Sequence, residues 1–395
     1  MLSKEIVELS KQHSVIRDIF EFGMKRAKIV GVENVFDFSI GNPSVPAPAK
    51  VDEEAIRMLQ EEDPVAIHGY TSNAGVLEVR DAIAQSLNRR FQTHYTSANI
   101  FMTIGAAAAL GICFRTLIDN PEDEVITFAP YFPEYQVYAQ GAGGKLTVIP
   151  AETSSFQIDF NKLEAAVNEH TKAVLINSPN NPSGVVYSKE TIQKLADLLE
   201  RKQKEIGHSI YIITDEPYRE IVYRGFEVPY VPKYYKNTLV TYSFSKSLSL
   251  PGERVGYIAV QSEAEDFEDL LPCFIASARL LSYVSVPALY QKVIGKCVDM
   301  TADLSIYQKN KDIFYQGLVD MGYECVEPGG AFYLFPKAPE ADAGAFCERA
   351  KKYDLLIVPG DSFGCPGYVR VSYCVPTQRI EKALPLFKQL IEEYK

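Results

Sequence analysis

The sequence predicts an α/β protein whose large domain contains a mostly parallel sheet covered by helices on both faces. Between residues 100 and 260, apolar runs of strand length alternate with segments of helical periodicity. That alternation is typical of parallel strands joined by helical crossovers. The chain has 395 residues, which is too many for one hydrophobic core. We therefore expect a second, smaller α+β domain built from the N- and C-terminal segments.

Composition and charge exclude several classes of protein. The chain is 47% hydrophobic and 23% charged, with a formal net charge of -11. An acidic surface repels phosphate backbones, so we expect no nucleic acid partner. No apolar run is long enough to span a membrane, and residues 1–10 are too charged for a signal peptide. Seven cysteines without a Cys-x-x-Cys pair favour a reduced, cytoplasmic compartment. The five histidines are scattered singly, so we expect no metal site.

Residues 1–45 are expected to form an N-terminal arm and part of the small domain. Helical spacing of apolar residues predicts a helix whose buried face contains Ile16, Ile19, Phe20 and Met24. A strand at 35–40 then enters a loop that begins at Gly41. A glycine lets the backbone approach a ligand closely, although a plain connector would have the same sequence.

Two loops of the predicted large domain, residues 46–285, precede helices. The first contains Tyr70, for which ligand contact and ordinary packing are both open. In the second, a strand at 100–104 ends at Gly105, and a helix starts at Ala106 and Ala107. The free N–H groups of such a helix start attract anions, although many α/β turns share this pattern.

Further predicted strands are 125–128, 146–149, 173–176 and 211–214. Phe132 follows the first of them and is suited either to stacking on a ligand ring or to the core. Asn181 follows the third, and Asp215 and Tyr218 follow the fourth. Because ligands of open α/β sheets bind at the carboxyl ends of strands, we expect these polar residues to converge on one edge.

The segment from residue 242 to 257 carries the most informative chemistry. It lies between predicted buried strands at 239–242 and 255–260. A lysine there, Lys246, requires either a shifted pKa or a partner, as in Schiff-base chemistry or an ion pair. Ser243, Ser245 and Arg254 supply the hydroxyls and the planar fork that bind a phosphate. An amine beside a phosphate site indicates pyridoxal phosphate, whereas the simpler alternative is a turn with a solvated lysine.

Residues 286–395 are predicted to form the small C-terminal domain. Helices with charged faces come first, and an alternating strand at 369–373 follows. Arg370 lies on this strand, and its side chain is expected on the opposite face from Val369 and Val371. It could bind a carboxylate or face water.

In combination, these segments resemble the fold-type I pyridoxal phosphate enzymes, in particular the class I/II aminotransferases. The resemblance runs from about residue 35 to residue 370 and implies a mixed, seven-stranded type of sheet. The matching motifs are Tyr70-x4-Gly75-x4-Arg80, Asn181-Pro182-Ser183-Gly184, Asp215-Glu216-Pro217-Tyr218, Ser243-Phe244-Ser245-Lys246 with Arg254, and the C-terminal Arg370.

The resemblance implies a role for each matching residue. Lys246 would hold the cofactor aldehyde and then move the substrate α-proton. Asp215 would keep the pyridine nitrogen protonated, and Tyr218 and Asn181 would bind the phenolic oxygen. Phe132 would stack on the ring.

The remaining implied contacts concern the phosphate and the substrate. Ser243, Ser245, Arg254 and the segment Gly105, Ala106 and Ala107 would hold the phosphate. Tyr70 would reach the cofactor of a neighbouring subunit, so a homodimer is implied. Arg370, with Gly41 and Asn181, would bind the substrate carboxylate. The expected reaction is a ping-pong transfer between an L-amino acid and a 2-oxo acid such as 2-oxoglutarate or pyruvate.

Two positions depart from relatives that bind dicarboxylic substrates. Aspartate-specific relatives of one branch have a lysine at the position of Ala107, and another branch has an arginine at the position of Leu281. Arg17 or Arg279 could substitute for these cations. A neutral, aromatic or sulfur-containing donor is at least as compatible with the sequence as aspartate.

Two other functions remain open from the sequence. A carbon–sulfur β-lyase of the cystathionine or cysteine type would use the same residues. A non-catalytic effector-binding module, as in regulators that fuse this fold to a DNA-binding segment, is disfavoured because only about 35 residues precede the fold and the chain is acidic.

Overall fold

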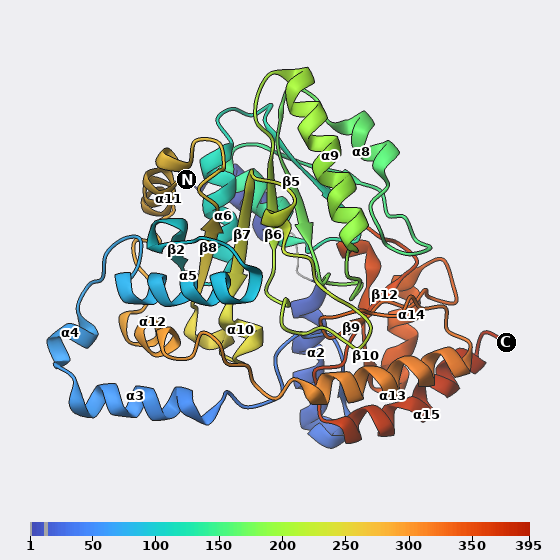
Figure 1. Cartoon of the computed structure of the whole chain (residues 1–395). Helices are drawn as coiled ribbons and strands as arrows, with labels where there is room; N and C mark the ends of the chain where they lie inside the picture. The colour runs from blue at the N-terminus through green and yellow to red at the C-terminus, as the bar shows by residue number, and fades with distance from the viewer. Residues whose placement is uncertain (1, 12–14) are drawn as a thin grey trace.

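The computed structural model describes residues 2–11 and 15–395 and confirms the predicted α/β class (Figure 1). The part of the chain that we call the large domain contains β2 (Ile100–Thr103), β3 (Glu124–Phe128), β4 (Lys145–Ile149), β5 (Thr171–Asn177), β6 (Tyr211–Asp215), β7 (Thr238–Ser243) and β8 (Gly256–Val260). These strands form one seven-stranded sheet in the order β2-β8-β7-β6-β5-β3-β4.

The helices of this domain lie on both sides of the sheet (Figure 1). They are α3 (Ala49–Glu61), α4 (Pro64–His68), α5 (Leu77–Phe91), α6 (Ala106–Leu117), α7 (Glu134–Ala142), α8 (Phe160–Ala166), α9 (Lys189–Ile206), α10 (Phe244–Ser247), α11 (Phe267–Leu280) and α12 (Ala288–Gly295). In the described part of the chain, no helix combines the length and apolar character needed to cross a membrane. The cytoplasmic location stays a prediction.

Strand side chains alternate between two buried layers. On β6, Ile213 packs in a cluster with Leu110 of α6 and Phe274 of α11. The preceding residue, Ile212, lies in a cluster with Leu195 of α9. Because helices cover both faces, the central strands contain continuous buried apolar runs, such as residues 173–176 of β5, as expected of a buried parallel sheet.

Strand direction places the loops of interest on one edge of the sheet. β3, β4, β5, β6 and β7 pair in parallel, and β8 runs antiparallel to both β7 and β2. β2 therefore has the same direction as the parallel strands. Gly105, Asn181, Asp215 and Lys246 follow or end strands of this direction, so all four lie at the carboxyl edge, as expected from the sequence.

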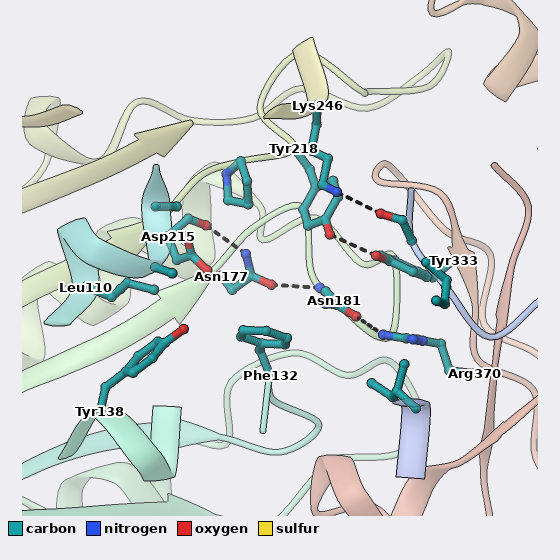
Figure 2. A pocket seen from close by; sticks show the side chains of 16 residues that line it. Leu110, Phe132, Tyr138, Asn177, Asn181, Asp215, Tyr218, Lys246, Tyr333 and Arg370 are labelled. Carbon is teal, nitrogen blue, oxygen red and sulfur yellow. Dashed lines mark hydrogen bonds between the residues drawn. The ribbon is translucent and has the colours of Figure 1, made fainter. Parts of the chain in front are cut away.

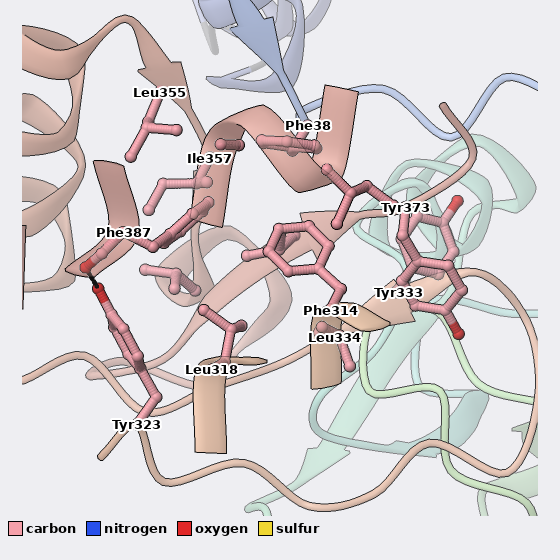
Figure 3. Close-up of a cluster of buried hydrophobic side chains, with 14 of the residues drawn as sticks. Phe38, Phe314, Leu318, Tyr323, Tyr333, Leu334, Leu355, Ile357, Tyr373 and Phe387 are labelled. Carbon is pink, nitrogen blue, oxygen red and sulfur yellow. Dashed lines mark hydrogen bonds between the residues drawn. The ribbon is translucent and has the colours of Figure 1, made fainter. Parts of the chain in front are cut away.

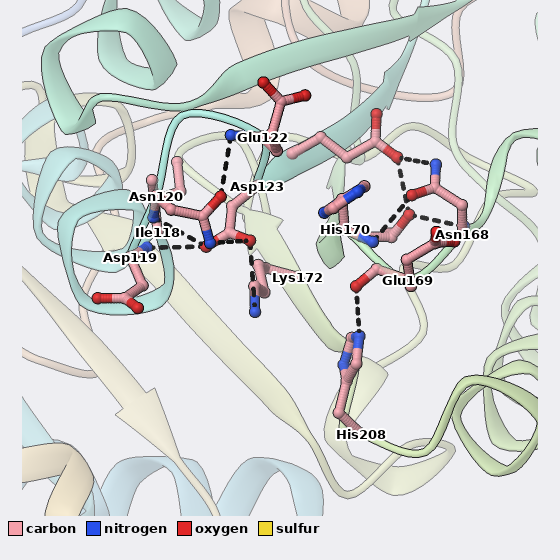
Figure 4. Close-up of polar contacts among 12 residues, drawn as sticks. Ile118, Asp119, Asn120, Glu122, Asp123, Asn168, Glu169, His170, Lys172 and His208 are labelled. Atoms are coloured by element: carbon pink, nitrogen blue, oxygen red, sulfur yellow. Dashed lines mark hydrogen bonds and ion pairs between the residues drawn. The ribbon is translucent and has the colours of Figure 1, made fainter.

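The opposite edge of the sheet is a network of satisfied polar groups (Figure 4). Asp123, just before β3, accepts hydrogen bonds from the backbone N–H groups of Asp119 at 2.9 Å and Asn120 at 3.2 Å. Its other oxygen lies 3.4 Å from the ammonium of Lys172. A buried carboxylate with these partners stabilises the strand starts and leaves no oxygen for a ligand.

The two ends of the chain form a second unit that we call the small domain. Its elements are α2 (Val15–Val30), β1 (Phe36–Asp37), α13 (Ser305–Met321), β9 (Tyr333–Leu334), α14 (Ala343–Ala350), β10 (Leu355–Leu356), β11 (Val358–Pro359), β12 (Val369–Ser372) and α15 (Thr377–Glu392). The first helix, α1 (Lys4–Lys11), precedes them, and its Leu9 lines a hollow together with residues of α7. β1 pairs in parallel with β10, and β12 lies between β11 and β9. The predicted strand at 35–40 is therefore shorter than expected, because its partner has only two residues.

The small domain has its own aromatic core (Figure 3). The Phe314 ring of α13 lies 5.1 Å from the Phe38 ring and 5.4 Å from the Phe387 ring of α15, measured between centroids. These contacts join residues from both ends of the chain. Such a core fixes β12, and with it Arg370, relative to the N-terminal segment.

The predicted N-terminal helix is α2, but part of its predicted buried face is wrong. Ile19 is buried, whereas Phe20 and Met24 are exposed. Gly23, one turn after Ile19, completes the contact, since a Cβ there would lie 2.6 Å from Leu356 Cδ1. The contact between α2 and Leu356 of β10 is thus made by a glycine. A pattern of apolar side chains does not reveal such a contact.

The contacts of α12 bear on the domain boundaries. Its residues Val293 and Ile294 lie in the same buried cluster as Val79 and Ile83 of α5. The boundaries after residues 45 and 285 stay a prediction, and this packing favours a C-terminal boundary after Gly295.

Candidate functional site

One cavity of about 290 Å³ opens at the carboxyl edge of the sheet, where the two domains meet (Figure 2). Nine of the residues singled out from the sequence line it: Gly41, Ala106, Ala107, Phe132, Asn181, Asp215, Tyr218, Lys246 and Arg370. Gly105, Ser243, Ser245 and Arg254 lie outside its lining, and so does Tyr70.

Lys246 enters the cavity from α10, a single helical turn directly after β7. Its Nζ donates a hydrogen bond to the Gly41 carbonyl at 2.7 Å and lies 5.6 Å from the centre of the Phe332 ring. Burial lowers the pKa of Lys246 to about 8, and the nearby charges of Arg254 and Arg370 act in the same direction. The neutral, nucleophilic fraction of this amine near neutral pH is therefore much larger than that of a solvated lysine.

Asp215 is the last residue of β6, and it is paired with Asn177 of β5 on one side and with Thr241 of β7 on the other. Tyr135 donates its hydroxyl to Asp215 Oδ2 at 2.7 Å, whereas Oδ1 is buried without a hydrogen-bond partner. Burial raises the pKa of Asp215 to about 7, although the Tyr135 hydrogen bond opposes this rise. A buried carboxylate oxygen in this state is suited to accept a hydrogen bond from a charged N–H group.

A chain of hydrogen bonds connects three elements across the cavity (Figure 2). Asn177 Nδ2 donates to the backbone carbonyl of Asp215 at 2.7 Å, and Asn177 Oδ1 accepts from the N–H of Asn181 at 2.7 Å. Asn181 Oδ1 then accepts from Arg370 at 3.0 Å. The loop after β5 is therefore held to β6 and to the small domain at the same time.

Arg370 is buried, and its guanidinium also donates to the Ser39 carbonyl at 2.5 Å. It lies 4.8 Å from the centre of the Tyr333 ring and 4.9 Å from that of Phe363. Its Nε has no partner. A buried guanidinium between two rings, with an unused N–H at a cavity, is suited to bind a carboxylate.

Tyr218 and Tyr333 meet at the same wall. Their hydroxyl oxygens are 2.9 Å apart, and their rings pack edge to face at 5.8 Å. Any side chain at Gly41 would collide with the Tyr333 hydroxyl. The glycine is therefore required by the close approach of the loop to this tyrosine.

The start of α6 is arranged as an anion site. Gly105 has φ +86, and a Cβ there would lie 2.6 Å from a guanidinium nitrogen of Arg254. Ser243 and Ser245 stand close by, at the β7–α10 junction, with hydroxyls 2.7 Å apart. Helix-start N–H groups, two hydroxyls and a guanidinium are the donors that a phosphate requires.

The fit of these groups to pyridoxal phosphate is specific in two respects. The unpaired oxygen of Asp215 matches a protonated ring nitrogen, and the amine of Lys246 matches an aldehyde. Phe132 lines the cavity wall and packs edge to face on Tyr135 at 5.7 Å. Tyr70 is fully exposed and is not part of the lining, and its role across a subunit interface stays a prediction.

The sequence did not single out several residues of the cavity. Asn177 and Tyr333 had a usable signal, because Asn177 follows a strand and Tyr333 follows a Gly-Gly loop. For Ile16, Leu110 and Tyr138, nothing in the sequence indicated a place in the site. The same is true of Tyr135, which lies outside the lining but binds Asp215.

The fold and this cavity define an α/β enzyme whose site combines a buried amine, a buried carboxylate and a buried guanidinium. Residues 33–385 match the family model described as aminotransferase class I and II. The chain belongs to this family and is an aminotransferase, so the predicted enzyme class is confirmed and the effector-module alternative is wrong. The family implies pyridoxal phosphate.

Similar proteins agree with this assignment. The aspartate aminotransferase of Thermotoga maritima is 32% identical over 388 residues, covering 97% of each chain. The aromatic-amino-acid aminotransferase 2 of Thermococcus litoralis is 27% identical and covers 97% of this chain and 96% of its own. The crystal structure of an amino transferase from Eubacterium rectale superposes with a TM-score of 0.98 at 54% identity, covering 100% of this chain and 99% of that one.

Proposed function

We propose that this chain transfers an amino group between an L-amino acid and a 2-oxo acid, 2-oxoglutarate or pyruvate, by a ping-pong mechanism with pyridoxal phosphate in the cavity. The observation that carries the proposal is the pairing, on one cavity, of a Lys246 amine whose pKa is lowered to about 8 with a buried, unpaired oxygen of Asp215.

The cofactor would be held at both ends. Asp215 Oδ1 would accept the ring N–H, and Tyr218 and Asn181 would bind the phenolic oxygen. Phe132 would lie against the ring. The phosphate would accept hydrogen bonds from the N–H groups of Ala106 and Ala107 at the start of α6, the hydroxyls of Ser243 and Ser245, and the Arg254 guanidinium.

When bound, pyridoxal phosphate supplies an aldehyde that holds the amino group and a ring that accepts electrons from the α-carbon. Lys246, freed from the aldehyde by the substrate, would remove the α-proton and return it to the carbon that had carried the aldehyde. Arg370, with the Gly41 backbone, would bind the α-carboxylate and so orient the α-hydrogen toward Lys246. Domain closure would exclude water from this transfer.

We also propose a homodimer in which Tyr70 reaches the phosphate of the partner subunit. Tyr70 is fully exposed in the single chain, and neighbouring apolar side chains such as Val65 and Leu77 are exposed as well. An interface over this surface would bury them. Light scattering should give twice the mass of the chain, and Tyr70→Phe should weaken cofactor retention.

The test of the proposed function is a half-reaction. Amino acids are added singly to the holoenzyme, and the absorbance of the cofactor is followed. The Lys246→Ala variant should show no conversion, and borohydride should no longer attach the cofactor to the protein. The matched control is Lys236→Ala, which removes an exposed lysine paired with Glu265. Conversion by Lys246→Ala at the wild-type rate would refute the proposal.

The β-lyase alternative is tested in the same preparation. Release of thiol and pyruvate from cystathionine or cysteine, without any 2-oxo acid acceptor, would favour elimination over transfer. Amino donor-dependent turnover of 2-oxoglutarate or pyruvate would favour transfer.

A further inference from the structure

The cofactor cavity continues outward into a second hollow. This hollow has a volume of about 460 Å³ and shares Ile16 and Phe132 with the first cavity. Its other walls combine apolar side chains such as Leu9, Val15 and Val137 with the uncharged polar ones of Gln136, Gln140 and Ser362, and its carboxylate is Glu134. A group that extends from the α-carbon of a bound substrate away from Arg370 would pass between Ile16 and Phe132 into this space.

The positive charges of the cavity stand at its inner end. Among the described residues that line the two hollows, the cations are Lys246 and Arg370. Lys246 is bound to the Gly41 carbonyl, and Arg370 is bound to Asn181 and is assigned to the α-carboxylate. Toward the mouth, the described lining is apolar or uncharged until it reaches Glu134.

We infer that this site selects donors with a bulky uncharged side chain, aromatic, aliphatic or thioether, over the dicarboxylic amino acids aspartate and glutamate. Because the same cavity binds the acceptor, pyruvate is then favoured over 2-oxoglutarate among the two proposed acceptors. The inference deepens the proposed transamination and rests on it. Apolar atoms of the donor would be removed from water when they pack against Ile16, Phe132 and Leu110. A second carboxylate would lose hydration without gaining a cation from the described lining, and it would approach Asp215 or Glu134.

An uncompensated buried charge lowers affinity by about 100-fold or more. We therefore expect the specificity constant of phenylalanine, methionine or leucine to exceed that of aspartate and glutamate by about 100-fold.

The first measurement compares these five donors, together with lysine and arginine, in the half-reaction of the holoenzyme. Higher specificity constants for the uncharged donors support the inference. Equal or higher constants for aspartate or glutamate overturn it, and so does a preference for lysine or arginine. If no amino acid converts the cofactor, the proposed function fails, and the inference is then decided by binding alone.

Binding is measured by calorimetry on the holoenzyme with two unreactive acids. 3-Phenylpropionate carries one carboxylate and an aromatic ring, whereas succinate carries two carboxylates. Tighter binding of 3-phenylpropionate supports an apolar side-chain site. Tighter binding of succinate overturns it whether or not the protein transaminates.

Charge variants at the mouth test the physical cause. Ile16→Lys places an ammonium between the two hollows, and Ile29→Lys on the same helix is the matched control, since Ile29 is 77% exposed and outside both hollows. Ile16→Lys should raise the aspartate-to-phenylalanine ratio of specificity constants at least about 10-fold, and Ile29→Lys should leave it unchanged. Glu134→Gln, which removes the carboxylate without changing shape, should raise the ratio about 3-fold. An unchanged ratio in both Ile16→Lys and Glu134→Gln would overturn the inference.

Discussion

Replacing Asp215 by asparagine should make the cofactor-free protein more stable at high pH while it removes activity. In the folded protein, burial raises the pKa of Asp215 from 3.8 to about 7. The folded state therefore holds this proton more tightly than the unfolded chain does. Stability is lost as the pH rises from about 4 to about 7, and the loss is constant above that range.

The size of the effect follows from the same two pKa values. At ~1.36 kcal/mol per pKa unit, ionising Asp215 in the folded state costs up to ~4 kcal/mol, of which ~2–3 kcal/mol falls between pH 5 and 8. An asparagine is neutral throughout. Its amide accepts the Tyr135 hydrogen bond and leaves one buried N–H group unpaired, which costs ~1–3 kcal/mol at every pH.

The assay is urea unfolding of the cofactor-free protein from pH 5 to pH 8. The free energy of unfolding of Asp215→Asn minus that of the wild type should increase by ~2–3 kcal/mol over this range. Contributions from other groups, such as Lys246, are common to both proteins and largely cancel. Asp197→Asn, an exposed change on α9, is the control. A difference that varies by less than ~0.5 kcal/mol would refute the buried-charge reasoning.

Two further predictions concern arginines. Arg370→Lys keeps the charge but loses the planar fork that contacts Asn181 and Ser39, so the specificity constant for the donor should fall about 10–100-fold with the cofactor spectrum unchanged. Wild-type kinetics would contradict the assigned contact. Arg219→Ala leaves the buried Glu216 carboxylate without its ion-pair partner, so the free energy of unfolding should fall by ~3–5 kcal/mol in a urea titration. A loss below ~1 kcal/mol would contradict this account.

Several residues could be placed from the sequence because their signal is local. Lys246 and Asp215 stand at the ends of apolar strands, and parallel strands of one sheet end at a common edge. The same reasoning brought Asn181 and Ala106 to that edge. It failed for Phe20 and Met24, since a helical apolar pattern does not identify which stripe meets the neighbouring element.

Other features of the site come from contacts between distant segments. Arg370 binds Asn181 across a separation of 189 residues, and Ile16 reaches the cavity from the first helices of the chain. The carboxylate of Asp215 is bound by the Tyr135 hydroxyl and its backbone carbonyl by the Asn177 amide, and these two residues lie on different elements.

The order of apolar runs, glycines and polar strand ends is enough to predict the α/β class and the residues at the carboxyl edge, and the motifs formed by these residues carry the resemblance to the aminotransferase family, because each of these signals is carried by neighbours in the chain. The lowered pKa of Lys246, the raised pKa of Asp215 and the absence of a cation from the described lining beyond Ile16 and Phe132 follow from how distant segments pack around the cavity. Burial sets these properties, and burial is a sum over atoms that are remote in sequence and adjacent in space.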